Sequence, residues 1–162
     1  MSANEPLIRP AARGDLKACA DIVNAHIDAL AWLPRIMDRE TVEAAFLAAF
    51  QNGRVMRVAD LEGVIVGYSS AEPRAPRPAL LHALYLRPHM RGRGIGRRLL
   101  DRVKADFPDG FELTVFAPND GARRFYEREG LVEDPARYEE ETQEGVPTHL
   151  MAWHGAGGSL PR

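Results

Sequence analysis

Glycines and arginines alternate in one short segment, where an apolar stretch meets a helical pattern. The segment 80–100 reads LLHALYLRPHMRGRGIGRRLL. Glycine allows backbone conformations and close approach that a Cβ would hinder, and the first turn of a helix presents N–H groups without partners. These amides and the positive end of the helix dipole favour a phosphate, and guanidinium groups match phosphate oxygens. The segment therefore predicts a phosphate-binding loop whose candidate residues are Arg91, Arg93, Gly94, Gly96 and Arg97.

Two common phosphate loops do not fit this segment. The dinucleotide fingerprint needs a third glycine where this chain has Arg97, and the chain has no Gly-x-x-x-x-Gly-Lys followed by Ser or Thr. The arginines also allow a nucleic-acid interpretation, but a formal net charge of -2 argues against it. We therefore expect a compact phosphate ligand and no nucleic-acid partner, with Arg98 and Arg102 as solvated helix residues.

Two motifs together resemble the GNAT superfamily of N-acetyltransferases. The first, Arg91-x-x-Gly94-x-Gly96, resembles the acyl-CoA-binding motif of that family. The second, NDGARRFYEREGL at 119–131, resembles the family's Asn-x-x-Ala-x-x-Phe-Tyr helix and the step into the next strand. The resemblance covers about residues 7–153 and implies acetyl-CoA as the cofactor. It also implies an α/β fold, with a mixed, twisted and mostly antiparallel central sheet flanked by helices.

The resemblance also gives roles to four further residues. Tyr126 matches a tyrosine that in many members lies near the cofactor sulfur and acts as the acid. A phenol with a reference pKa of ~10 can serve a thiolate of ~8.5 without being ionised at neutral pH. Leu84 and Leu86 would contribute main-chain contacts to the pantetheine arm. Asn119 would contact the pantetheine or support the loop, and it is also a plausible helix N-cap.

The general base is left open between His82, Glu72 and a water molecule. His82 lies on the expected central strand, where family members often carry a glutamate, and its reference pKa of ~6.5 suits proton abstraction near neutrality. It could equally bind the substrate or fill the pocket. Glu72 ends the preceding strand. Strand alternation places His82, Leu84 and Leu86 on one face.

Hydrophobic periodicity and turn residues predict the elements that position these groups. We expect Asp15 to cap the first helix. Trp32 follows that helix and, by the resemblance, borders the acceptor site, although it could equally cover the core. The expected helices are 16–30, 39–50, one after the Arg/Gly loop and one from 119 to 130. The expected strands are 7–9, 54–60, 63–72, 79–86, 111–116 and 148–153, with a turn at Gly63.

Composition is consistent with one domain over residues 1–162. The chain is 45% hydrophobic, enough for one sizeable core. Cys19 is the only cysteine, which suits a reducing cytoplasm. The start, MSANEPLIRP, lacks the pattern of a signal peptide, and no apolar run approaches the ~20 residues that span a bilayer. We expect a soluble cytoplasmic protein without a membrane partner, and a flexible tail at 155–162.

The predicted reaction is direct transfer of the acetyl group of acetyl-CoA to a primary amine of a small molecule or peptide. Direct transfer is favoured because no Cys or Ser lies in a recognisable nucleophile setting. The alternative is a domain that binds acyl-CoA and regulates a partner without turnover. The acidic run Glu139–Glu141 is interpreted as an exposed turn, and no metal is expected. The family resemblance suggests a homodimer, whereas the identity of the amine and the length of the acyl group are left open.

Overall fold

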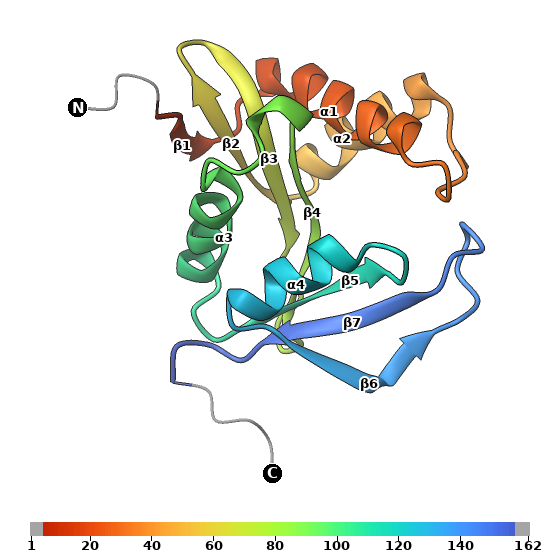
Figure 1. The fold of residues 1–162 in the computed structure, drawn as a ribbon. Coiled ribbons are helices and arrows are strands. Elements are labelled where there is room, and N and C mark those ends of the chain that lie inside the picture. Colours follow the sequence, from red (N-terminus) through yellow and green to blue (C-terminus); the bar gives the residue numbers. More distant parts are fainter. Residues whose placement is uncertain (1–4, 158–162) are drawn as a thin grey trace.

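A seven-stranded sheet runs through the computed structural model, which describes residues 5–157 (Figure 1). The strand order is β1-β2-β3-β4-β5-β7-β6, and only the β4–β5 pair is parallel. This architecture is the mixed, mostly antiparallel sheet that the sequence predicts. The strands are β1 (Leu7–Pro10), β2 (Val55–Leu61), β3 (Val64–Glu72), β4 (Ala79–Leu86), β5 (Phe111–Phe116), β6 (Val132–Glu139) and β7 (Thr148–Trp153).

Helices cover the sheet on both faces, with α1 and α2 on one face and α3 and α4 on the other (Figure 1). Short 3₁₀ turns precede α1 and follow β4. Among the described residues, no helix is long and apolar enough to cross a membrane. The helices are α1 (Leu16–Ala29), α2 (Arg39–Gln51), α3 (Ile95–Asp106) and α4 (Asp120–Arg128), and the 3₁₀ turns are η1 (Arg13–Asp15) and η2 (Pro88–Met90).

The core forms because each helix turns an apolar stripe to the sheet. On one face Cys19 and Ile22 of α1 pack with Tyr68 of β3. On the other face Leu99 and Leu100 of α3 are fully buried. Complete burial of one such leucine stabilises the fold by roughly 1.5–3 kcal/mol. The helices are therefore held firmly against the sheet, and the loops that join them are positioned by that packing.

Local sequence signals account for most turns and caps. Glu62 and Gly63 both have positive φ, which gives the tight β2–β3 turn predicted at Gly63. Asp15 occupies the N-cap position of α1, as expected, but it does not cap the helix with its side chain. Its side chain makes no cap hydrogen bond to α1 and instead accepts from the Ala12 N–H and from Arg9. Asp15 therefore stabilises the 3₁₀ turn that leads into the helix.

The C-terminal part differs in two ways from the expected ranges. Strand β6 was not assigned a range by periodicity, because its sequence VEDPARYE is mostly exposed and carries a proline. Charge and proline are typical of an edge strand, which is the position that β6 has in the sheet. Of the predicted tail at 155–162, residues 158–162 lie outside the described residues.

Candidate functional site

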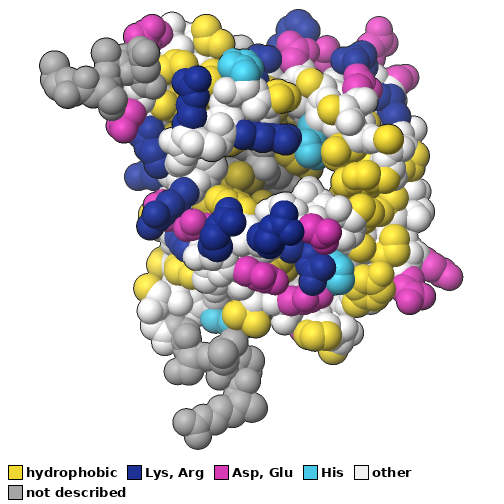
Figure 2. All heavy atoms as spheres, viewed as in Figure 1, with side chains coloured by type: hydrophobic (Ala, Val, Ile, Leu, Met, Phe, Trp, Pro, Cys, Tyr) yellow, Lys and Arg dark blue, Asp and Glu magenta, His cyan; other side chains and the backbone are white. Residues whose placement is uncertain are grey.

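Strands β4 and β5 separate soon after they begin. They pair only at Ala79 with Phe111 and at Leu80 with Glu112. Within residues 5–157, no strand pairs with β4 on its β5 side beyond Leu80, and a gap opens toward the C-terminal end of β4. Figure 2 shows a hollow at the centre of this face, above α4. A sheet edge without a partner strand can bind an extended ligand through main-chain hydrogen bonds.

The free main-chain groups belong to alternate residues of β4. The Arg87 N–H donates to the Val66 carbonyl of β3 at 2.9 Å. Backbone groups in an antiparallel pair alternate in direction from one residue to the next. Leu84 and Leu86 therefore direct their N–H and C=O groups away from β3 and into the gap, where the resemblance places the pantetheine arm.

The Arg/Gly loop lies at the open end of the gap, because it follows the C-terminal end of β4. Gly92 and Gly94 have φ of 77°, a region that residues with a Cβ rarely adopt. Gly94 is the N-cap of α3, and no side chain caps this helix. The first amides of α3 are therefore available to an anion. Gly96 lies in the first turn, where a Cβ would be 3.6 Å from the Phe125 ring, an ordinary contact.

The arginines of this region differ in their surroundings. Arg91, Arg93 and Arg97 are exposed, and Lys and Arg side chains rim the hollow in Figure 2. Arg97 forms a long ion pair with Glu129 at 3.6 Å, and its side chain is 69% exposed, so this pair is weak. Arg98, expected to be solvated, instead donates to the Pro6 carbonyl at 2.7 Å and is half-buried.

Helix α4 places Tyr126 and Asn119 beside the gap. Asn119 is the N-cap of α4 and accepts from the Ala122 N–H at 3.2 Å, which leaves its amide NH₂ group without a role in the cap. Tyr126 is 8% exposed. Burial raises its pKa well above the ordinary value of 10, and the nearby Tyr85 phenol raises it further. Tyr126 therefore stays protonated near neutral pH and is able to donate a hydrogen bond.

His82 is an extra residue in a β-bulge. The register shifts from the Ser70–Ala83 pair to the Ala71–Leu81 pair, so that His82 has no partner on β3. Leu81, and not His82, packs in one apolar cluster with Leu84. The expectation that His82 shares a face with Leu84 and Leu86 is therefore wrong, because the bulge interrupts the alternation on which it rested.

The two candidate bases form one hydrogen-bonded pair. His82 Nε2 lies 2.6 Å from Glu72 Oε2. Burial is the largest influence on His82 and lowers its pKa, and the hydrogen bond to Glu72 opposes this only in part. The same hydrogen bond lowers the pKa of Glu72. Near neutral pH, the imidazole is therefore neutral and can accept a proton, while the Glu72 carboxylate orients it.

Trp32 reaches from the α1–α2 connection to the far side of the gap. Its ring meets Phe116 of β5 edge-on, with ring centroids 5.8 Å apart. The connection is anchored by Arg35, which donates to the Asn24 side chain at 2.8 Å and to Asp28 at 2.9 Å. Trp32 therefore connects the α1–α2 loop to β5, and its role at the acceptor site stays a prediction.

Tyr85 also lies in this region, although the sequence pointed to no role for it. Its ring packs against His26 of α1, with centroids 4.5 Å apart, and it is close enough to Tyr126 to affect that residue's pKa. Strand alternation could not reveal this contact, because it exists only where β4 and β5 separate. Among residues 5–157, no three His, Cys, Asp or Glu side chains are placed to hold a metal ion.

Known proteins share this fold and part of the sequence. The L-amino acid N-acyltransferase MnaT of Escherichia coli (strain K12) is 31% identical over 102 residues, and the match spans 59% of this chain and 59% of MnaT. The structure of yncA from Salmonella typhimurium, solved with its cofactor acetyl-CoA, has a TM-score of 0.76 and 21% identity. That match covers 97% of this chain and 98% of yncA.

A solved structure from Brucella melitensis has a similar fold. This ribosomal-protein-alanine N-acetyltransferase has a TM-score of 0.72 and 24% identity, and the match covers 91% of this chain and 99% of that one. At such identity the solved structures show a common fold. The sequence model of the acetyltransferase (GNAT) family matches residues 22–131, more than half of the chain. The chain therefore belongs to the acetyltransferase (GNAT) family.

Proposed function

We propose that the protein is an N-acetyltransferase that transfers the acetyl group of acetyl-CoA directly to a primary amine of a small molecule or peptide. The observation that carries this proposal is the gap between β4 and β5. An anion-binding loop lies at its open end, free backbone groups line its edge, and a buried phenol lies beside it. The name of MnaT, an L-amino acid N-acyltransferase, supports an amino acid as the acceptor.

The residues at the gap suit the parts of acetyl-CoA. Arg91, Arg93 and Arg97 and the amides after Gly94 would hold the pyrophosphate, since a helix N-terminus with glycine in the left-handed region leaves room for phosphate oxygens. The main chain at Leu84 and Leu86 would hydrogen-bond the amides of pantetheine. The Asn119 amide NH₂ group would add a further donor. When bound, acetyl-CoA supplies a thioester with an electrophilic carbonyl carbon.

The groups around the reacting centre each have one task. His82, held by Glu72, takes the proton of the acceptor amine directly or through a water molecule. A main-chain N–H near Leu84 would donate to the thioester oxygen, which gains charge in the transition state. Tyr126 would donate a hydrogen bond to the sulfur of the leaving CoA. Because its pKa is raised, stabilising the thiolate is favoured over complete transfer of the proton.

The test is thiol release from acetyl-CoA across a panel of amino acids, other small amines, aminoglycosides and peptides. Calorimetric titration of CoA into the same protein measures cofactor binding separately. We expect CoA binding and turnover with one class of acceptor. Tight CoA binding without turnover on any amine would contradict the enzyme and favour a regulatory acyl-CoA-binding domain. Fractionation and size-exclusion chromatography would test the cytoplasmic location and the homodimer, which stay predictions.

A further inference from the structure

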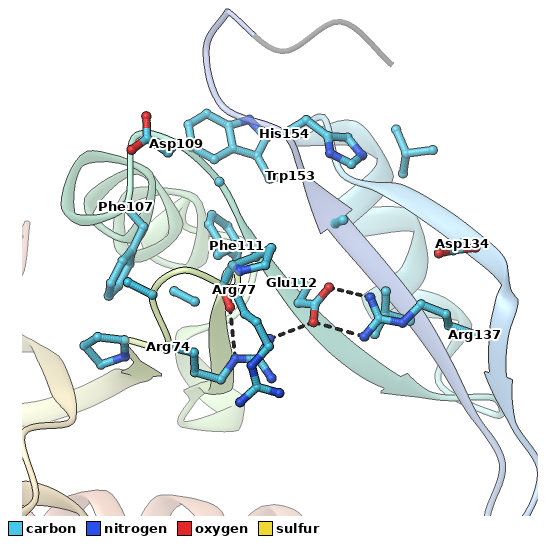
Figure 3. A pocket seen from close by; sticks show the side chains of 18 of the residues that line it. Arg74, Arg77, Phe107, Asp109, Phe111, Glu112, Asp134, Arg137, Trp153 and His154 are labelled. Atoms are coloured by element: carbon cyan, nitrogen blue, oxygen red, sulfur yellow. Dashed lines mark hydrogen bonds and ion pairs between the residues drawn. The ribbon is translucent and has the colours of Figure 1, made fainter. Parts of the chain in front are cut away.

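A second hollow lies at the end of the sheet where β4 and β5 are still paired. This cleft has a volume of about 860 Å³ and lies between the Pro-rich β3–β4 loop and strands β6 and β7 (Figure 3). Arg74 and Arg77 enter it from the loop, and Arg137 enters it from β6. Arginine, with its planar fork of donors, is suited to binding carboxylates and phosphates.

One carboxylate neutralises only part of this charge. Glu112 of β5 is buried and accepts from Arg74 at 2.6 Å and from Arg137 at 2.7 and 3.1 Å (Figure 3). Arg77 is exposed and makes no ion pair or side-chain hydrogen bond with any residue that the structure describes. Figure 3 shows its guanidinium group beside that of Arg74.

The other carboxylates that line the cleft do not neutralise the remaining positive charge of the arginines. Asp106 is bound by Arg57, and Glu133 is bound by Arg123. Asp109 lies at the opposite end of the cleft from the arginines (Figure 3). Asp134 is near enough to Arg137 to raise the pKa of that arginine. Three guanidinium groups therefore share two carboxylates, Glu112 and Asp134, at this end of the cleft.

One arginine of the cleft, Arg74, lies near Glu72, the hydrogen-bond partner of the candidate base His82. Register pairs align Glu72 with Leu80 and Leu80 with Glu112, so that these residues form one row across the sheet. Strands are spaced ~4.8 Å apart, which puts the backbones of Glu72 and Glu112 about 10 Å from each other. Arg74 lies between them, since its charge lowers the pKa of Glu72 while its guanidinium binds Glu112. Arg74 therefore links the arginine end of the cleft to the Glu72–His82 pair.

We propose that Arg77, with Arg74 beside it, binds a carboxylate of the acceptor, so that the protein selects amines that also carry a carboxylate. This inference rests on the proposed function and adds the residues that give its substrate preference. Arg77 makes the direct contact, because its donors have no other partner among the described residues. Glu112 is a positioning residue that holds Arg74 and Arg137 in place.

Matched acceptors and one substitution test the inference. L-leucine, L-methionine and L-phenylalanine are each compared with the corresponding carboxamide, which keeps the amine and removes the negative charge. We expect kcat/KM to be about 10- to 100-fold higher for each amino acid than for its amide, as for one charged hydrogen bond. Arg77→Gln should remove most of this difference, mainly through KM, and leave turnover of the amides unchanged. Arg102→Gln, an exposed arginine of α3 away from the cleft, is the control.

Calorimetric binding of the same ligands in the presence of CoA separates this inference from the proposed function. Tighter binding of the amino acids than of the amides, lost in Arg77→Gln, supports the carboxylate subsite even if no acceptor is turned over. Equal binding of acids and amides overturns the subsite, even if both are acetylated. An equal loss for both ligand types in Arg77→Gln also overturns it.

Discussion

Tyr126 has a ring buried in the core and is the residue that we propose as the hydrogen-bond donor to the departing sulfur. The ring packs edge-on against Phe125, with centroids 5.1 Å apart, and belongs to the core cluster between α4 and the sheet. Packing thus fixes the position of the hydroxyl, and burial keeps it protonated. A change that removes only the oxygen atom can separate its chemical role from its structural one.

Tyr126→Phe should lower kcat by about 10²-fold, at the lower end of the range for an acid catalyst. The KM for acetyl-CoA and the free energy of unfolding should change little, because the ring is retained. Steady-state kinetics and urea unfolding measure these effects. Tyr138→Phe, an exposed tyrosine of β6, is the matched control. An unchanged kcat would show that Tyr126 is only part of the core.

The His82–Glu72 pair makes a prediction about pH. If neutral His82 is the base, kcat/KM rises with pH through the pKa of His82, which burial lowers below its ordinary 6.5. The Glu72 hydrogen bond favours the protonated imidazole. Glu72→Gln removes that effect, so the rising limb should move to lower pH while kcat/KM on the plateau falls. Profiles of kcat/KM from pH 4.5 to 9 measure both effects.

His82→Ala and an exposed control complete this test. His82→Ala should abolish the rising limb of kcat/KM. Glu43→Gln on α2, the control, should have the same pH profile as the native protein. A rising limb that persists in His82→Ala would assign the base to another group or to water.

At the scale of elements, the loop before α3 depends on one backbone conformation. Gly94 has φ 77° and ψ 6°, and its position as N-cap aims the first amides of α3 at the open end of the gap. A Cβ would meet no atom there within 4 Å, so the cost of alanine is conformational rather than steric. A left-handed residue with a Cβ costs roughly 1–2 kcal/mol.

Gly94→Ala should therefore lower the free energy of unfolding by about 1 kcal/mol and weaken CoA binding about five-fold or more. Urea unfolding and calorimetry measure the two effects. Gly14→Ala is the control. A Cβ added at Gly14 would also meet no atom within 4 Å, but Gly14 does not have a positive φ. Lower stability with unchanged CoA affinity would contradict the role of this loop in phosphate binding.

How far the sequence predicts these elements depends on whether the signal is local. The strand 79–86 and the turn at Gly63 were predicted correctly, because alternation and turn residues act within a few positions. The bulge at His82 was not, since it depends on how β4 pairs with β3 and leaves no mark in the sequence of β4 alone. An error of one residue in register reverses the face of a side chain.

The candidate site shows the same limit. The loop residues could be named from their types and spacing, whereas the Glu72–His82 hydrogen bond depends on the pairing of two strands. Likewise, Tyr85 comes near Tyr126 only because β4 and β5 diverge, and the buried Glu112 meets arginines from two distant segments. These contacts are long-range, so neither periodicity nor a short motif could predict them.

At the scale of the molecule, half-buried ion pairs join segments that are distant in sequence. Arg9 binds Asp15 and Asp60, Arg57 of β2 binds Asp106 at the end of α3, and Glu112 joins the β3–β4 loop to β6. The arginines lower the pKa of Asp15 and of Glu112. Asp15 and Glu112 therefore stabilise the fold above their unfolded pKa of ~4, and this stability is lost as pH falls through the lower pKa of the folded state.

Glu112 has the most closely enclosed of these carboxylates, with a side chain that is 8% exposed. Glu112→Gln removes its charge and leaves Arg74 and Arg137 without a counter-ion, which should lower the free energy of unfolding at pH 7 by about 1–3 kcal/mol. This is less than for a fully buried pair, because Arg137 is 51% exposed.

Protonated Glu112 resembles glutamine, so the difference in the free energy of unfolding between Glu112→Gln and the native chain should shrink as pH falls from 5 to 3. Urea unfolding across that range, with exposed Glu127→Gln as control, measures it. A difference independent of pH would mean that Glu112 acts through packing and not through its charge.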